Sequence, residues 1–300
     1  MVRGTLLVLG ASLAPSPALA HAGGATDLWH AYSLDPYVVL PMLLAAAVYG
    51  LGLARLWGRA GRGRGIETWR AGCFAAAMLA LSLALIWPFD VLGGTILSAH
   101  MVQHVLLTAV AAPLLVLSVP LTAGLWALPL AARRAAGGVA HTAGIRQGWR
   151  WLTLPLFAWA LYAASLWLWH MPRFYEAAAG DEWVHVLEHV CFLGSALMLW
   201  WAALLSARTS ALGVGTGIFL LFTTACQDGL LGALLVFSPR PLYGFYAEAA
   251  HLLGRDPLAD QQLAGVIMWL VGGMIYLCAA LALAWKFLLP AGRAPLRLRA

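Results

Sequence analysis

Two five-residue segments of the chain carry pairs of histidines with the same spacing. His100 and His104 enclose the segment HMVQH, and His185 and His189 enclose the segment HVLEH. Residues four apart lie on one face of a helix, so both imidazoles of a pair can reach the same ion. Imidazole is a common ligand of zinc, copper, iron and nickel. The spacing therefore indicates a metal or haem site that two helices build together.

The residue three places after the first histidine of each pair can support such a site. Gln103 and Glu188 hold these positions and share the helix face of the histidines, where they would orient a ring or bind the ion. Glu188 also opens a second interpretation, because HVLEH fits the H-x-x-E-H pattern of zinc hydrolases, in which the glutamate is a general base. A third interpretation is a haem group held by facing histidines.

Methionines beside the histidines favour copper as the ion. Met101 adjoins His100, and Met171 follows His170 at the end of another apolar segment. A thioether selects Cu(I), and imidazole suits copper as well. The methionines therefore favour copper, while zinc and haem stay open at this point. The expected ligands form a layer of five histidines: His100, His104, His170, His185 and His189.

The composition places these residues in a lipid bilayer. Of the 300 residues, 62% are hydrophobic and 10% are charged, with a mean hydropathy of +0.82, whereas soluble proteins have roughly 25% charged residues. This excludes a soluble enzyme. The net charge of +6 would suggest nucleic acid as the partner of a soluble protein. Here we expect no nucleic acid, because basic residues also set the orientation of a membrane protein.

Seven apolar segments are long enough to cross about 30 Å of hydrocarbon. They predict an all-α bundle of seven transmembrane helices at 36–57, 70–89, 97–119, 150–170, 183–206, 212–237 and 262–286. Pro113 and Pro155 are expected to kink their helices. We expect the third span to continue past Pro120 into an interfacial segment with Trp126.

The ends of the chain and the arginines predict the orientation. Residues 1–20 have a basic start, an apolar run and a small-residue end, as in a secretory signal peptide. Arginines gather in alternate loops, for example between Arg55 and Arg70, and such loops are cytoplasmic. We thus expect a periplasmic segment 21–35, a transmembrane domain 36–290 and a cytoplasmic tail 291–300. The histidine layer then lies near the periplasmic face.

Three acids have their own expected roles. Asp228 lies near the middle of the sixth span, where we expect it to be protonated or hydrogen-bonded to Gln227 or Thr224, with a proton relay as the alternative. Asp181 and Asp260 stand just before the fifth and seventh helices, and each is expected to cap its own helix.

Longer motifs resemble a known family. They are Ser98-Ala-His-Met-Val-Gln-His104 with Ala112-Pro-Leu-Leu115, Trp169-His-Met-Pro172 with Tyr175, Leu187-Glu-His189, and Asp256-Pro-Leu-Ala-Asp-Gln-Gln-Leu-Ala-Gly265 with Met268-Trp269. Together they resemble the polytopic CtaG family of cytochrome c oxidase assembly factors, from the first helix to the last.

The resemblance implies a non-enzymatic protein of the bacterial inner membrane that matures a haem-copper oxidase. It implies an oxidase subunit in the membrane as the partner and copper delivery as the stage of assembly. The positions that match the family pattern are His100, Gln103, His104, His170, Glu188, His189, Asp260 and Gln261. His185 completes the second pair by its spacing.

Overall fold

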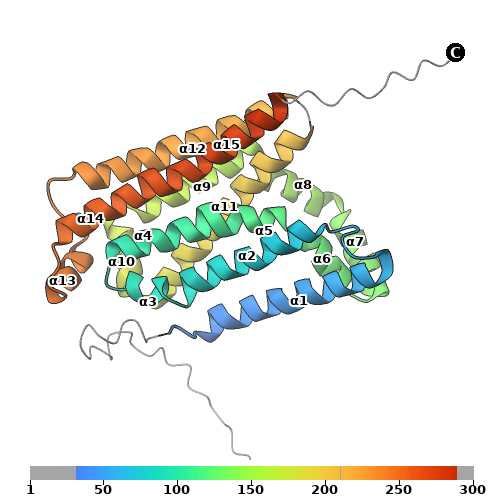
Figure 1. The fold of residues 1–300 in the computed structure, drawn as a ribbon, viewed down its shortest axis with the longest axis horizontal. Helices are drawn as coiled ribbons and strands as arrows, with labels where there is room; N and C mark the ends of the chain where they lie inside the picture. The colour runs from blue at the N-terminus through green and yellow to red at the C-terminus, as the bar shows by residue number, and fades with distance from the viewer. Residues whose placement is uncertain (1–31, 210, 289–300) are drawn as a thin grey trace, which may run out of the picture.

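Long apolar helices form a bundle in the computed structural model, which describes residues 32–209 and 211–288 (Figure 1). Every regular element in this part of the chain is helical, which confirms the all-α prediction. Six helical segments are long and apolar enough to cross a membrane, so the chain is a multi-pass membrane protein. The predicted signal peptide 1–20, most of the segment 21–35 and the tail 291–300 lie outside the described residues.

The six spans agree closely with six of the predicted ones. They are Pro36–Ala60 (α1); Thr68–Gly93 (α2, Thr68–Leu85, and α3, Phe89–Gly93); Leu97–Leu117 (α4, Leu97–Val105, η2, Leu106–Ala111, and α5, Ala112–Leu117); Glu182–Leu204 within α11 (Glu182–Thr209); Gly213–Phe237 within α12 (Ala211–Phe237); and Pro257–Trp285 (α14, Pro257–Val266, η3, Ile267–Gly272, and α15, Gly273–Leu288). The other helices are α6 (Pro120–Ala127), α7 (Leu130–Ala140), α8 (Ala143–Leu152), α9 (Pro155–Trp169), α10 (Pro172–Gly180) and α13 (Gly244–Leu252).

The fourth predicted span, 150–170, is broken in the structure. α8 and α9 are long enough to cross a membrane only as a pair, and they are bent by 60° relative to each other. The bend follows from Pro155, which begins α9 and lacks the N–H that would continue α8. The predicted kink at Pro155 is therefore present. With its 15 residues, α9 alone extends about 22 Å at 1.5 Å per residue.

The third span passes Pro113 by changing its hydrogen-bond register. Residues 106–111 form the π-helical segment η2, in which the N–H of Ala112 donates to Leu107 O, five residues back. Pro113 has no N–H for the next carbonyl in this register, that of Thr108. The indole N–H of Trp200 donates to that carbonyl instead, at 2.9 Å. The span thus stays continuous through its proline.

The chain turns sharply after this span, contrary to the prediction that the span continues past Pro120. Val119 has a left-handed backbone (φ 49°), and α6 begins at Pro120 as a separate helix. α6 packs against α1, where Gly52 permits close contact: a Cβ there would lie 1.8 Å from the carbonyl oxygen of Ala123. Trp126 thus lies on a helix that covers α1.

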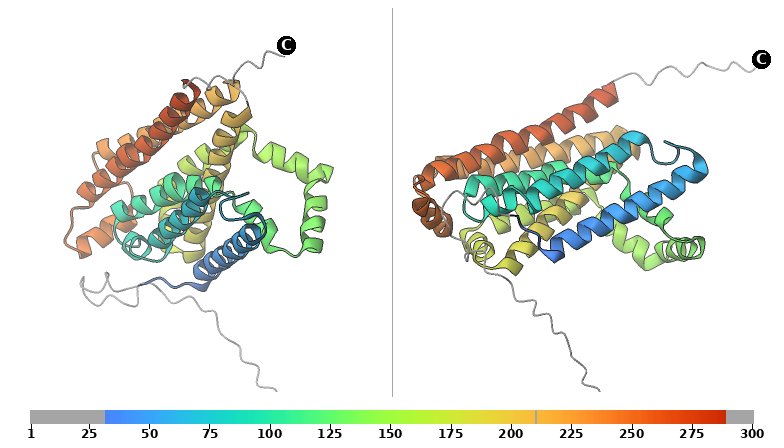
Figure 2. Two further views of the ribbon diagram at one scale, coloured as in Figure 1. Left: turned by 45° about the vertical axis from the view of Figure 1, so that its right-hand side comes forward. Right: turned by 60° about the horizontal axis from the view of Figure 1, so that its bottom comes forward.

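The two ends of the bundle differ in their polar residues. We call the end that carries α3, α10 and α13 the histidine end, on the left of Figure 1, and the opposite end, with α7 and α8, the arginine end. α7 and α8 contain no buried residue and project from the bundle (Figure 2). The main buried core runs through α4, α9, α11, α12 and α15. At the histidine end this core contains ionisable side chains.

Candidate metal centre

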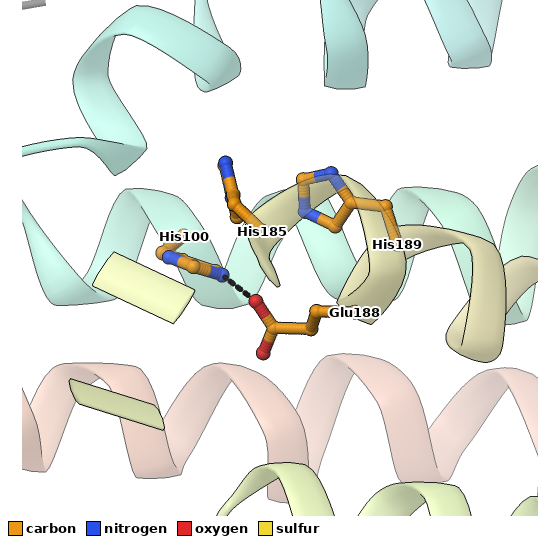
Figure 3. A group of neighbouring side chains, drawn as sticks. All are labelled: His100, His185, Glu188 and His189. Atoms are coloured by element: carbon orange, nitrogen blue, oxygen red, sulfur yellow. Dashed lines mark ion pairs between the residues drawn. The ribbon is translucent and has the colours of Figure 1, made fainter. Parts of the chain in front are cut away.

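Four potential ligands converge between α4 and α11. His100 comes from α4, and His185, Glu188 and His189 come from α11, with one ligand atom of each within 4.8 Å of the others. We call these residues the four-residue cluster. Figure 3 shows the four side chains close together, with Glu188 facing His100. The pairs that the sequence singled out thus meet at one place.

Two acids fix the starts of the helices that carry the cluster. Asp181 accepts hydrogen bonds from the backbone N–H groups of Trp183 (2.9 Å) and Val184 (3.0 Å), which confirms it as the cap of α11. The prediction that Asp260 caps its own helix is wrong. Asp260 reaches across to α4 and accepts from Leu97 N at 2.8 Å and from the Ser98 hydroxyl. The cap of α14 is Asp256, which accepts from Leu258 N at 2.9 Å.

A tyrosine on α13 fixes the tautomer of His100. The hydroxyl of Tyr246 donates to the Gly93 carbonyl at 2.7 Å and lies 2.6 Å from His100 Nδ1. Burial raises the pKa of Tyr246 well above its ordinary value, so the hydroxyl keeps its single proton. Since that proton points to Gly93, Nδ1 of a neutral His100 must be the donor, and Nε2 carries the free lone pair. Nε2 is the nitrogen that faces Glu188, at 3.7 Å.

The carboxylate of Glu188 is buried without a hydrogen-bond partner in the described part of the chain. Its side chain is 0% exposed, and Nε2 of His100 and Nε2 of His104 each lie 3.7 Å from one of its oxygens. Nε2 of His185 and Nε2 of His189 are likewise buried and unpartnered. An unpaired buried carboxylate costs several kcal/mol. A cation among these groups would satisfy all of them, so the donor set fits a metal ion.

The spacing of the imidazole rings also fits a shared ion. With metal–nitrogen bonds of about 2.0–2.1 Å, two imidazoles on one ion have centroids about 4.5–6.4 Å apart. The ring of His100 lies 5.3 Å from that of His185 and 6.0 Å from that of His189. The last two rings are 4.2 Å apart, just below this range. Small side-chain shifts would bring all three nitrogens onto one ion.

The other two predicted histidines adjoin the cluster on its inner side. His104 lies one turn further along α4, with Nε2 2.8 Å from His100 Nε2 and its ring 5.7 Å from that of His189. His170, at the end of α9, has its ring 5.8 Å from that of His104. The structure therefore brings all five histidines into one connected group, although only three of them belong to the four-residue cluster.

The remaining candidate residues point elsewhere. Gln103 donates to the Ala84 carbonyl (2.9 Å) and to Asp90 (3.0 Å) on the side of α2 and α3. Gln261 holds the loop before α13 through Leu242 N, at 2.6 Å. Met101 is buried in the apolar core, and Met171 is 52% exposed. In this arrangement the amides of Gln103 and Gln261 are not ligands of the cluster. The same holds for the thioethers of the two methionines.

Asp228 has a different partner from the two predicted. It accepts a hydrogen bond from the hydroxyl of Tyr162, at 3.4 Å, whereas Thr224 donates to the Leu220 carbonyl. Its second oxygen is buried and has no partner in the described residues, and neither has the amide nitrogen of Gln227. Asp228 thus belongs to a polar group near mid-bundle, together with Tyr162 and Tyr276, whose hydroxyls are 3.0 Å apart.

Comparison with known proteins adds the family. The family model described as "Cytochrome c oxidase caa3 assembly factor (Caa3_CtaG)" matches residues 47–288. The matched region contains the four-residue cluster, His104, His170 and Tyr246. No curated protein and no solved structure matches the chain.

Proposed function

The chain belongs to the family of cytochrome c oxidase caa3 assembly factors, and from that premise we propose that it carries copper to the oxidase. The copper ion is its cargo and binds in the four-residue cluster. The recipient is an oxidase subunit beside it in the bacterial inner membrane. We further propose that the protein has no catalytic activity of its own.

One observation supports this proposal above the others. Glu188 presents a fully buried, unpaired carboxylate beside three imidazoles, and one ligand atom of each of these four residues lies within 4.8 Å of the others. Without a cation this arrangement is costly; with a cation it becomes a complete coordination shell of three nitrogens and one oxygen. Imidazole suits copper, and copper is the ion that a haem-copper oxidase must receive.

The position of the cluster suits a carrier. It lies one or two turns from the starts of α4 and α11, at the histidine end of the bundle. His185 is half-buried, whereas His100 and Glu188 are buried, so His185 is the ligand nearest to the surface. We propose that the histidine end is periplasmic, because the arginine-rich loops mark the other end as cytoplasmic. An ion then enters and leaves past His185.

The experiment combines metal analysis with oxidase assembly. The purified full-length protein and the variants His185→Gln and Glu188→Gln are loaded with copper, and each variant also replaces the natural protein in cells. We expect both variants to lose the cluster's copper and to lower oxidase activity severalfold. His251→Ala, which changes an exposed histidine on α13, is the matched control. Unchanged copper content together with unchanged oxidase activity in both cluster variants would contradict the proposal.

A zinc hydrolase is the second candidate, because Glu188 lies between His185 and His189 as in the H-x-x-E-H pattern. In that case Glu188→Gln keeps the metal and abolishes hydrolysis. The carrier proposal instead expects Glu188→Gln to weaken metal binding, since the carboxylate is itself one of the four ligands and faces the ligand His100. Haem fits the site less well, because a porphyrin would separate its axial histidines, whereas here four ligand atoms lie within 4.8 Å of one another.

A further inference from the structure

A small cavity lies on the inner side of His104, toward the middle of the bundle. The space in this cavity that the centre of a water molecule can occupy measures about 20 Å³. This is enough for one water molecule or one ion. Among its lining residues are His104, Thr108, Tyr162, His170 and Asp228. The cavity therefore joins the histidine group to the buried acid of α12, which the proposed function leaves unused.

Three side chains that line this cavity each have an unpartnered polar atom. They are His104 (Nδ1), His170 (Nε2) and Asp228 (Oδ1), and none of these atoms has a hydrogen-bond partner within the described ranges. The residues are 4%, 5% and 6% exposed, so water outside the protein does not satisfy them. Leaving such atoms unpaired is costly unless something fills the cavity.

The hydrogen bonds around the two histidines leave lone pairs on these same nitrogens. Nδ1 of His170 lies 2.8 Å from the Leu166 carbonyl, which can only accept, so Nε2 of the neutral ring carries the lone pair. Nε2 of His104 lies 2.8 Å from Nε2 of His100, which is itself an acceptor because its Nδ1 donates to Tyr246. While the four-residue cluster is empty, His104 must then donate from Nε2, and its lone pair is on Nδ1.

The geometry of the two rings matches a pair of ligands. Their centroids are 5.8 Å apart, within the range of about 4.5–6.4 Å for two imidazoles on one ion with metal–nitrogen bonds of about 2.0–2.1 Å. Cu(I) accepts as few as two ligands. A carboxylate in the same cavity would balance its single positive charge, so the filled cavity would be neutral in a medium where net charge is costly.

We propose that this cavity is a second, inner binding site for the cargo, in which His104 and His170 bind Cu(I) and Asp228 balances its charge. This inference rests on the proposed function. His104 joins the two sites, since its Nε2 faces the four-residue cluster and its Nδ1 is free for the inner ion. The protein then holds two copper ions at different depths, and His104 forms the step between them. Only ligands are exchanged in this step, and no electron is transferred.

The test counts ions on the purified full-length protein in detergent. Cu(I) is titrated without oxygen against a chromogenic Cu(I) chelator, at a chelator concentration that leaves the wild-type sites filled. We expect two ions per wild-type chain and one ion in His170→Gln and in Asp228→Asn. Asp90→Asn changes another acid within the bundle, one that accepts a hydrogen bond from Gln103, and should keep two ions.

The outcomes separate this inference from the proposed function. One ion per wild-type chain, lost in His185→Gln but kept in His170→Gln and Asp228→Asn, would overturn the inner site and leave the cargo proposal standing. No ion on the wild-type chain would overturn both. If Asp228→Asn does not fold, the wild-type count still decides. Tyr162→Phe then gives a milder variant, which removes the hydrogen bond to Asp228, keeps the carboxylate and should retain two ions.

Discussion

Glu188 and the imidazoles around it form a buried set of potential ligands that would be stabilised by a bound cation. The carboxylate and the free nitrogens of His185 and His189 are buried and lack partners among the described residues. The same features that make the empty site costly would favour a bound cation. At the scale of single residues, the proposed function therefore depends on the charge of Glu188.

We expect Glu188→Gln to weaken Cu(I) binding at the four-residue cluster by at least tenfold, about 1.4 kcal/mol. The amide keeps the shape of the side chain but removes the negative charge. Competition with a chromogenic chelator measures the change. Glu182→Gln, one residue into α11, is the control, because its carboxylate accepts from the Tyr37 hydroxyl and lies outside the cluster. Equal losses in the two variants would count against a ligand role for Glu188.

Tyr246 contacts the proposed ligand His100 and would affect a bound ion through it. We expect Tyr246→Phe to lower copper affinity by about 10- to 100-fold, as loss of a residue that orients a ligand commonly does, because Nδ1 of His100 loses its partner. The control is Tyr243→Phe: this hydroxyl donates to the His170 carbonyl at 3.0 Å and does not touch His100. An unchanged chelator competition curve in Tyr246→Phe would show that the tautomer of His100 does not need this tyrosine.

The sequence indicates the histidine pairs but not the residues that orient them. The pairs follow from helix spacing, which is local. Tyr246 is 146 positions away from His100 and belongs to no motif beside it, so only the contact of the two side chains in the folded structure reveals its role. Gln103 shares a face with the histidines, yet its amide turns to α2 and α3, because a helix face is wide enough to contact two neighbours.

At the scale of elements, the start of α4 depends on a residue of α14. Asp260 provides the cap that α4 lacks in its own sequence. We expect Asp260→Ala to lower the free energy of unfolding by about 0.5–2 kcal/mol and to reduce copper occupancy, because His100 lies in the first turn of α4. Thermal unfolding in detergent and metal analysis measure the two effects.

The control for this change is Asp256→Ala. Asp256 caps α14 itself, so its loss should cost a similar free energy and leave the copper content intact. The account of α4 is wrong if both variants keep their copper, or if both lose it.

The π-helical segment η2 gives a prediction about stability alone. Trp200→Phe leaves the Thr108 carbonyl buried and unpaired, which should cost about 1–3 kcal/mol of unfolding free energy. Pro113→Ala supplies a backbone N–H for that carbonyl, so the cost of Trp200→Phe should shrink in the double variant. Thermal unfolding of the wild type, the two single variants and the double variant gives the coupling free energy between Trp200 and Pro113. Additive effects would mean that Trp200 does not compensate for the proline.

Hydropathy predicts where the spans lie but not how they are interrupted. Six spans lie close to the predicted positions, because bilayer thickness fixes their length. The kink at Pro155 has a local cause, so the sequence predicts it. The sequence does not predict the turn at Val119, because a left-handed valine is unfavourable and nothing in its residue type indicates it. Asp260 was assigned to the wrong helix because sequence alone does not show that α14 packs beside α4.

On the scale of the whole molecule, polar chemistry is concentrated at one end of an apolar bundle. Five histidines, Glu188 and Asp228 extend inward from the histidine end, through buried core that α4, α11 and α12 share. α1 covers this bundle from outside, with 11% of its most apolar stretch buried. In the proposed function, these polar groups would balance the charge of a cation inside an apolar medium.

The most direct test of the central claim is the copper-to-protein ratio of the purified full-length protein after anaerobic loading, measured by elemental mass spectrometry beside the His185→Gln variant. The proposed function predicts bound copper on the wild-type protein and the loss of the cluster's ion in the variant. A wild-type protein that retains no copper, or a variant that retains as much as the wild type, would contradict it.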